Sequence, residues 1–130
     1  CYISHKNEED MIKLFEAWRV DLIVLVGYMR IVKNPDAFPA PIINVHPSLL
    51  PKYKGLHAIE QAMEAGEEYT GCTVHYVNEE LDAGEIIIQK QVPILPTDDV
   101  QSLTKAVQRM EYAIVPAAIE IVKNESLEKL

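Results

Sequence analysis

Cysteine, glycine and aromatic residues are all scarce in this sequence. Its 130 residues include two cysteines, five glycines and one tryptophan, and only 7% of the residues are aromatic. The cysteines, Cys1 and Cys72, are far apart and form neither a disulfide framework nor a metal-ligand spacing. We therefore expect two free thiols in a reducing compartment, which predicts a cytoplasmic protein.

Positive charge is also in short supply. Twelve lysines and arginines face 20 aspartates and glutamates, which leaves a net charge of −8. A surface that neutralises phosphates must be basic, so this balance argues against nucleic acid as a partner. No apolar run approaches the roughly 20 residues that span a bilayer, since the longest covers only residues 22–27. We therefore expect small-molecule partners rather than nucleic acid or a membrane.

The pattern of hydrophobic residues indicates alternating helices and strands. Residues 8–19 have the apolar spacing of an amphipathic helix. Residues 21–27 form a continuous apolar run, which is typical of a strand buried on both faces. The remaining segments predict strands at 42–46, 72–77 and 85–92, an irregular loop at 47–55, and a helix at 56–65 that ends at Gly66. We therefore predict one α/β domain over residues 1–130, with three layers and a largely parallel sheet.

A long helix is predicted at the end of the chain. Asp98 and Gln101 have the spacing of a capping box at its start. One apolar stripe follows the helical repeat and consists of Leu103, Val107, Met110, Ile114, Ala117 and Ile121. We expect this stripe to face the sheet.

Polar residues with chemical potential follow the predicted strands. Asn44 and His46 are two residues apart on one strand, so their side chains point to the same face. An amide donor beside an imidazole can stabilise a developing oxyanion. Asp82 lies in the loop ELDAG. Taken alone, each of these residues is more often structural than catalytic. The spacing of His46, His57, His75 and Cys72 matches no zinc site, so we predict no metal.

Longer motifs give these residues a context. The strings NVHPSLLPKYKGLHAIEQAMEAG and GCTVHYVNEELDAGEIIIQKQVP resemble the folate-dependent formyltransferases, as do VGYMRIV at 26–32 and QRMEYAIVP at 108–116. The likeness spans residues 21–122. Lys54-Gly55-Leu56-His57 resembles the glycinamide ribonucleotide branch, because the methionyl-tRNA branch typically has Arg-Gly followed by Pro-Ile there. The related deformylases typically have His-His-Ser in place of His46-Pro47-Ser48.

The resemblance implies a Rossmann-like formyltransferase fold and an activity. The implied reaction moves a formyl group from 10-formyltetrahydrofolate, as co-substrate, to the primary amine of glycinamide ribonucleotide in purine biosynthesis. Asn44, His46 and Asp82 match the catalytic trio. The folate pocket matches Met29, Arg30, Ile31 and Val32, and the loop over the pterin matches Asn78, Glu79, Glu80 and Leu81. Glu111 matches an acidic residue that holds the substrate amine, and His75 is interpreted as structural or peripheral.

One part of the family pattern is missing from these residues. The family fold begins with a βαβ unit whose glycine-rich loop holds the ribose phosphate. The five glycines at 27, 55, 66, 71 and 84 are too widely spaced to form such a loop. We therefore expect the C-terminal two-thirds of the fold, with self-association through the open edge of strand 21–27. Two alternatives remain: another transferase or hydrolase that uses 10-formyltetrahydrofolate, and a non-catalytic folate-binding fragment.

Overall fold

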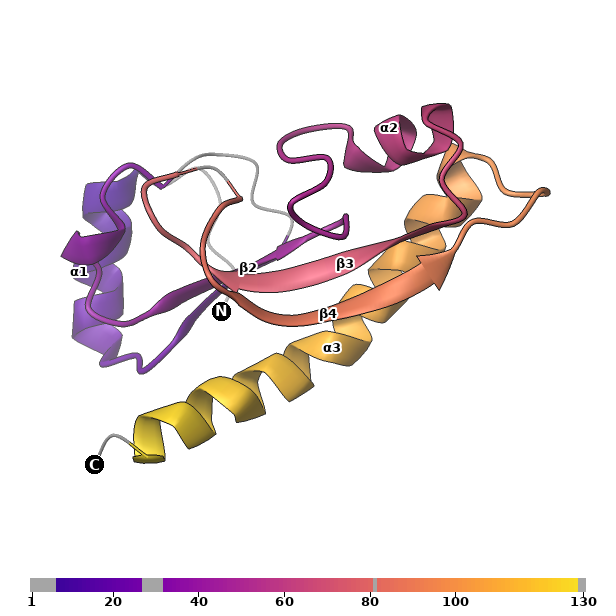
Figure 1. The fold of residues 1–130 in the computed structure, drawn as a ribbon. Coiled ribbons are helices and arrows are strands. Elements are labelled where there is room, and N and C mark those ends of the chain that lie inside the picture. The colour runs from indigo at the N-terminus through magenta and orange to yellow at the C-terminus, as the bar shows by residue number, and fades with distance from the viewer. Residues whose placement is uncertain (1–6, 27–31, 81, 129–130) are drawn as a thin grey trace.

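The computed structural model of the protein describes residues 7–26, 32–80 and 82–128 (Figure 1). Its elements in chain order are α1 (Glu8–Trp18), β1 (Ile23–Val26), the short 3-10 helix η1 (Pro35–Ala37), β2 (Ile42–His46), α2 (Ala58–Glu64), β3 (Tyr69–Tyr76), β4 (Ile86–Pro93) and α3 (Val100–Glu128). Every helix and strand expected from the sequence is therefore present. Within the described ranges, no helix combines the length and the apolar character needed to cross a membrane.

The four strands form one sheet in the order β1-β2-β3-β4. Only β1 and β2 are parallel, while β3 is antiparallel to both β2 and β4. The expectation of a largely parallel sheet is therefore wrong for the described strands. The connection 47–68, which contains the seven-residue α2, leaves from the end of β2 and rejoins the sheet at that same end, where His46 pairs with Thr73. Strand β3 therefore runs back along β2. After the loop 77–85, β4 runs back along β3.

The helices cover both faces of the sheet, which confirms the three-layer α/β architecture (Figure 1). Strand residues alternate between faces. Ile43 and Val45 pack with Leu103 and Val107 of α3 in the larger core. Ile42, one residue away, packs with Ile23 and Met11 of α1 in a second core. Asn44 and His46 therefore lie on the face of β2 that α3 does not cover.

Strand β1 differs from the expectation of a strand buried on both faces. Ile23 is buried, Val24 and Leu25 are partly buried, and Val26 is 45% exposed. The cause is the position of β1 at the edge of the described sheet, where it pairs with β2 alone. One row of its backbone groups thus has no strand beside it among the described residues.

Helix α3 is shifted slightly from its predicted pattern. Its N-terminal cap consists of Asp99 and Ser102, whose side chains each accept a hydrogen bond from the other's backbone N–H, rather than of Asp98 and Gln101. Leu103, Val107 and Ile114 are buried as predicted, but the buried residues of the last turns are Ala118 and Val122. Ala117 and Ile121 were expected there. The stripe advances by one residue because 3.6 residues per turn drifts over a helix of 29 residues.

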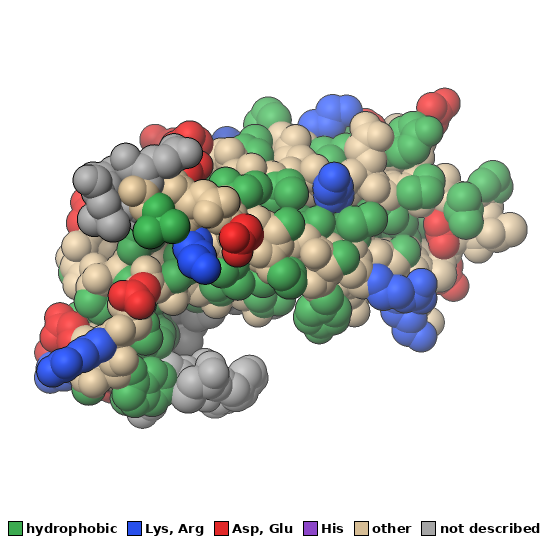
Figure 2. Space-filling view, turned by 90° about the horizontal axis from the view of Figure 1, so that it is seen from below, with side chains coloured by type: hydrophobic (Ala, Val, Ile, Leu, Met, Phe, Trp, Pro, Cys, Tyr) green, Lys and Arg blue, Asp and Glu red, His purple; other side chains and the backbone are tan. Residues whose placement is uncertain are grey.

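The face of the molecule below the sheet carries many apolar side chains. Viewed from below, it shows mostly hydrophobic and uncharged atoms, with charged side chains at intervals (Figure 2). On α3 the large exposed apolar residues include Tyr112, Ile119 and Leu127, which are 70%, 37% and 57% exposed.

Candidate active site

The antiparallel pairing of β2 and β3 brings two histidines and an asparagine to one face. Asn44 is the register partner of His75, and His46 is the partner of Thr73. Partners on antiparallel strands share a face. Asn44 Nδ2 accordingly lies 3.3 Å from His75 Nε2. Both histidines are almost fully buried, at 5% exposure for His46 and 2% for His75.

The loop between β3 and β4 carries Asp82 into this group. Asp82 has a φ of 50°, in the left-handed region that aspartate tolerates better than most residues. Gly84 allows the loop to return closely against β3, because a Cβ at this position would collide with the carbonyl of Tyr76. The Asp-x-Gly spacing thus has a structural reason. It lets the loop turn tightly enough to bury the Asp82 side chain, which is 9% exposed.

Asp82 is held by three partners. Its Oδ2 accepts a hydrogen bond of 2.8 Å from the backbone N–H of Gly55 and lies 3.4 Å from His46 Nδ1. Its Oδ1 lies 3.7 Å from His75 Nε2. Burial works against the charged carboxylate, but His75, the Gly55 N–H and His46 together outweigh it and lower the pKa of Asp82. The site therefore favours an ionised carboxylate between two imidazoles.

The loop 47–55 supplies backbone partners to both ends of the His46–Asp82 pair. His46 Nε2 lies 2.8 Å from the carbonyl oxygen of Tyr53, and a carbonyl can only accept, so this nitrogen carries the proton. His46 Nδ1 faces the Asp82 carboxylate, which is also an acceptor. In the neutral ring, the short contact with Tyr53 therefore favours the form with its proton on Nε2.

His75 has a different set of partners. Its Nδ1 lies 2.9 Å from the carbonyl oxygen of Tyr76, so Nδ1 donates. Its Nε2 lies between two partners: without a proton it can accept from the Asn44 amide, and with one it can donate toward Asp82 Oδ1. The other amide atom, Asn44 Oδ1, is buried without a hydrogen-bond partner. Such groups are rare in folded proteins, and this one marks the place where a further donor fits.

The structure brings together the predicted trio but not the other predicted site residues. Met29, Arg30, Ile31 and Leu81 lie outside the described residues. Val32 is buried in the second core, against α1. Asn78, Glu79 and Glu80 are exposed in the loop that carries Asp82. Their roles in folate binding remain predictions.

Glu111 lies on α3. Burial raises the pKa of the Cys72 thiol to about 12, and the negative charge of Glu111 makes a smaller contribution in the same direction. Cys72 neighbours Thr73 on β3 and therefore points to the opposite face, where it joins the larger core. Burial also raises the pKa of Glu111 to about 7. Its role in holding the substrate amine remains a prediction.

We predict a pH-dependent gain in stability for Glu111→Gln. The raised pKa means that the folded state loses the Glu111 proton only near pH 7, whereas the unfolded state loses it near its ordinary value of 4.5. Stability therefore falls as pH rises through this interval. Thermal unfolding should show equal midpoints for the two proteins at pH 4 and a higher midpoint for Glu111→Gln at pH 8. Equal midpoints at both pH values would contradict the burial of the Glu111 charge.

His75 is the site residue that sequence reasoning undervalued. The signal available was its position in the strand predicted at 72–77, on the same face as Thr73. Its significance depends on pairing with Asn44, and the sequence does not show which strands pair. Among the described residues, no group of three His, Cys, Asp or Glu side chains is arranged to hold a metal ion.

A separate hollow lies at the other end of β2. It has a volume of about 410 Å³ and is lined by Pro35, Asp36, Phe38, Pro39, Ala40, Pro41, Ile42, Tyr76 and Val77. It borders the start of β2 and the end of β3 and includes none of the trio. We therefore place the chemistry at the Asp82 cluster rather than in this hollow.

Comparison with known proteins gives the arrangement a family. The formyl transferase family model matches residues 3–119. A phosphoribosylglycinamide formyltransferase of Haemophilus influenzae is 48% identical over 103 residues, which are 78% of this chain and 49% of that protein. The trifunctional purine biosynthetic protein adenosine-3 of Drosophila melanogaster is 45% identical over 131 residues, covering 94% of this chain and 10% of that protein.

Solved structures agree with this assignment. The phosphoribosylglycinamide formyltransferase of Anaplasma phagocytophilum superposes with a TM-score of 0.85 at 41% identity, over 90% of this chain and 58% of that one. The glycinamide ribonucleotide transformylase 1 of Symbiobacterium toebii superposes with a TM-score of 0.80 at 46% identity, over 85% and 53%. The protein belongs to the formyl transferase family. The chain spans about half the length of the bacterial relative and about a tenth of the trifunctional one.

Proposed function

We propose that these residues form the catalytic part of an enzyme that transfers a formyl group from 10-formyltetrahydrofolate to the primary amine of glycinamide ribonucleotide. The observation that carries the proposal is the buried Asp82 carboxylate between His46 and His75, beside an Asn44 amide with an unpartnered oxygen. Acyl transfer between nitrogens needs a proton acceptor and a stabiliser for an oxyanion. The cluster offers both. The relatives whose names specify this reaction support the choice of substrates.

The reaction begins when the neutral amine attacks the formyl carbon. A carbon–nitrogen bond forms, and the electron pair of the carbonyl moves to oxygen. The Asn44 Nδ2 group has a second N–H beyond the one directed to His75, and this can donate to the oxyanion. When its ring is protonated, His46 adds positive charge on the same face. Asn44 Oδ1 can accept an N–H of the attacking amine, which supplies its missing partner.

The second half of the reaction moves a proton. The attacking nitrogen becomes an ammonium and passes one proton to Asp82, directly or through a water molecule. The lowered pKa of Asp82 keeps it ionised and ready to accept. Asp82 passes this proton, directly or through a water molecule, to the folate nitrogen as its bond to the formyl carbon breaks, and the carbonyl re-forms. The products are the formamide of the ribonucleotide and tetrahydrofolate, and none of these steps requires a metal ion.

Two other activities use parts of the same chemistry. A hydrolase would use water in place of the amine, and a non-catalytic module would bind the folate without transfer. The buried His46 and Asp82, with the Asn44 amide beside them, favour a catalytic role, because a carboxylate with a shifted pKa among such groups is typical of a reaction site. An assay for transfer to the ribonucleotide amine, with formate release measured in parallel, distinguishes the three activities.

We predict that Asn44→Ala lowers kcat by roughly 10²–10³-fold, as for the loss of one oxyanion donor. The Michaelis constants should change much less, because the oxyanion exists only in the transition state and the intermediate. Steady-state kinetics with both substrates varied measure this split. A variant with normal kcat and raised Michaelis constants would make Asn44 a binding residue instead.

A further inference from the structure

Tyr53, in the loop 47–55 beside the site, has a left-handed backbone conformation. Its φ is 54°, in the left-handed region that tyrosine rarely adopts. The carbonyl of this residue is the one that accepts the His46 Nε2 proton. A contact outside the site must therefore help to keep Tyr53 in place.

The first half of the loop is fastened to the sheet. Thr73 Oγ1 donates to the carbonyl of Ser48 at 2.7 Å and accepts from the N–H of Leu50 at 3.2 Å. Gln89 donates to the carbonyl of Leu50 at 2.8 Å. Two further bonds lie on either side of Tyr53: Ser48 Oγ donates to the carbonyl of Lys52 at 2.6 Å, and the Gly55 N–H donates to Asp82. None of these bonds holds the Tyr53 side chain.

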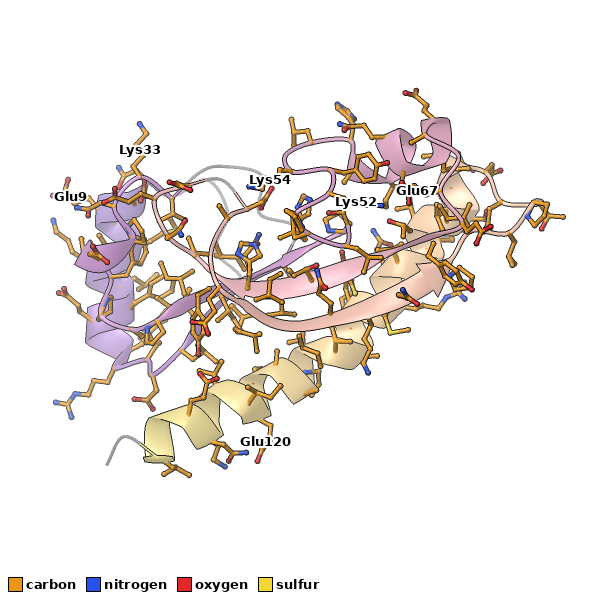
Figure 3. The ribbon with its side chains drawn as sticks, viewed as in Figure 1. Glu9, Lys33, Lys52, Lys54, Glu67 and Glu120 are labelled. Carbon is orange, nitrogen blue, oxygen red and sulfur yellow. The ribbon has the colours of Figure 1, made fainter. Side chains whose placement is uncertain are left out.

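Glu67 holds the second half of the loop. The Tyr53 hydroxyl donates to Glu67 Oε1 at 3.1 Å, and the Lys52 ammonium lies 3.2 Å from Oε2. Lys52 and Glu67 lie side by side between the loop and the start of β3 (Figure 3). Glu67 itself sits at the end of α2, where its backbone N–H donates to the carbonyl of Ala62. The carboxylate thus connects the segment just after α2 to Lys52 and Tyr53, the two loop residues next to the site.

Of the two contacts that Glu67 makes, the one with Tyr53 affects the site and the one with Lys52 does not. The Lys52 side chain is 59% exposed, so its ion pair with Glu67 contributes little by itself. Burial, together with the Glu67 carboxylate, raises the pKa of Tyr53, so the hydroxyl remains a donor. Tyr53 is then fixed at both ends: its hydroxyl by Glu67 and its carbonyl by His46.

We propose that Glu67 is a positioning residue for His46, acting through the side chain and carbonyl of Tyr53. The expected effect of Glu67 on turnover rests on the proposed function, whereas its expected effect on the imidazole of His46 does not. With Nε2 committed to Tyr53, only Nδ1 faces Asp82, and the ring cannot rotate or exchange tautomers. Without Glu67, the Tyr53 carbonyl loses its fixed orientation and the His46 ring becomes free to adopt either tautomer.

Two readouts test this on the 130 residues joined to a family βαβ segment. The first is the nitrogen NMR signal of His46, which reports whether Nε2 or Nδ1 holds the proton in the neutral ring. Tyr53→Phe and Glu67→Ala should each convert a pure Nε2–H signal into a mixture. The second is kinetics: kcat should fall about tenfold, with Michaelis constants within about twofold, as expected for a displaced catalytic group.

Matched variants separate positioning from general damage. Glu67→Gln keeps an oxygen that accepts from Tyr53, so it should preserve the tautomer and most of kcat. Tyr69→Phe removes a hydroxyl from a residue that is 47% exposed at the start of β3 and should change neither readout. The double variant Glu67→Ala/Tyr53→Phe should be no worse than either single one, because both remove the same bond.

The outcomes are distinct. A pure Nε2–H signal in Tyr53→Phe and Glu67→Ala overturns the proposal, whether or not kcat changes. A mixed signal that Glu67→Gln does not restore overturns it as well. If the unaltered protein shows no transfer at all, the proposed function fails, but the NMR comparison still decides whether Glu67 positions His46.

Discussion

Replacing Asp82 by asparagine should lower the rate of formyl transfer by about 10²–10⁴-fold, the usual contribution of a general acid–base group. Asparagine has nearly the same shape and can still accept the hydrogen bond that Gly55 donates to Oδ2. It cannot take a proton from the attacking amine. The variant should therefore retain its fold and its affinity for a folate analogue while losing turnover.

The pH dependence sharpens this test. The lowered pKa of Asp82 means that the carboxylate stays ionised well into the acid range. Its pairing stabilises the fold above the unfolded pKa of 3.8, and this contribution disappears as pH falls through the lower folded value. Asp82→Asn should therefore show a weaker loss of stability than the unaltered protein below about pH 4. Asp21→Asn, an exposed residue before β1, is a matched control that should change neither rate nor acid stability. Near-normal turnover in Asp82→Asn would remove Asp82 from the mechanism.

The 130 residues alone should show little or no transfer to the ribonucleotide. They contain no closely spaced glycines that would form a phosphate-binding loop. Without a partner for the phosphate, the substrate loses binding energy that would otherwise place its amine at the formyl carbon, so kcat falls as well as affinity. A folate analogue should still bind weakly.

The exposed surface of the chain adds a second expectation to this experiment. Strand β1 forms the edge of the described sheet and ends at Val26, which is 45% exposed. An apolar strand edge of this kind pairs readily with other chains. The 130 residues alone should therefore self-associate. Joining the upstream βαβ segment of a bacterial relative, or adding it as a separate chain, should restore transfer and reduce association.

Calorimetry with a folate analogue, a transfer assay and sedimentation on both forms measure these changes. The control is the same βαβ segment with its glycine loop disrupted by substitution, because it can still pair with β1 but cannot bind phosphate. It should reduce association and leave transfer low. Robust turnover by the 130 residues alone would show that the phosphate binds elsewhere on this chain.

Local patterns predicted the elements well because each element is set mainly by its own residues. The apolar spacing of residues 8–19 and the capping by Gly66, which has a φ of 72°, both appear in the structure. Strand direction could not be predicted in the same way. A β-branched segment such as 72–77 has the same composition whether its neighbour runs parallel or antiparallel. The direction of β3 depends on the path of the connection 47–68. That path is set in part by the hydrogen bonds that hold Ser48 to β3 and Tyr53 to His46.

The site shows a similar division. Asn44 and His46 were predictable together, because strand periodicity alone places them on one face. Asp82 could be added only through the family resemblance, since its approach depends on the turn at Gly84. His75 and the Tyr53 carbonyl were beyond sequence reasoning. The place of His75 depends on the register between β2 and β3. The place of the Tyr53 carbonyl depends on the left-handed conformation of Tyr53, which contacts distant in sequence maintain.

The most direct test follows the formyl carbon itself. The 130 residues joined to the family βαβ segment are given 10-formyltetrahydrofolate labelled at the formyl carbon, together with glycinamide ribonucleotide and methionyl-tRNA in one solution. The proposed function predicts that the label appears in the ribonucleotide formamide, at a rate that Asp82→Asn lowers by about 10²-fold or more. Label recovered as free formate or on the tRNA, with none on the ribonucleotide, would contradict it.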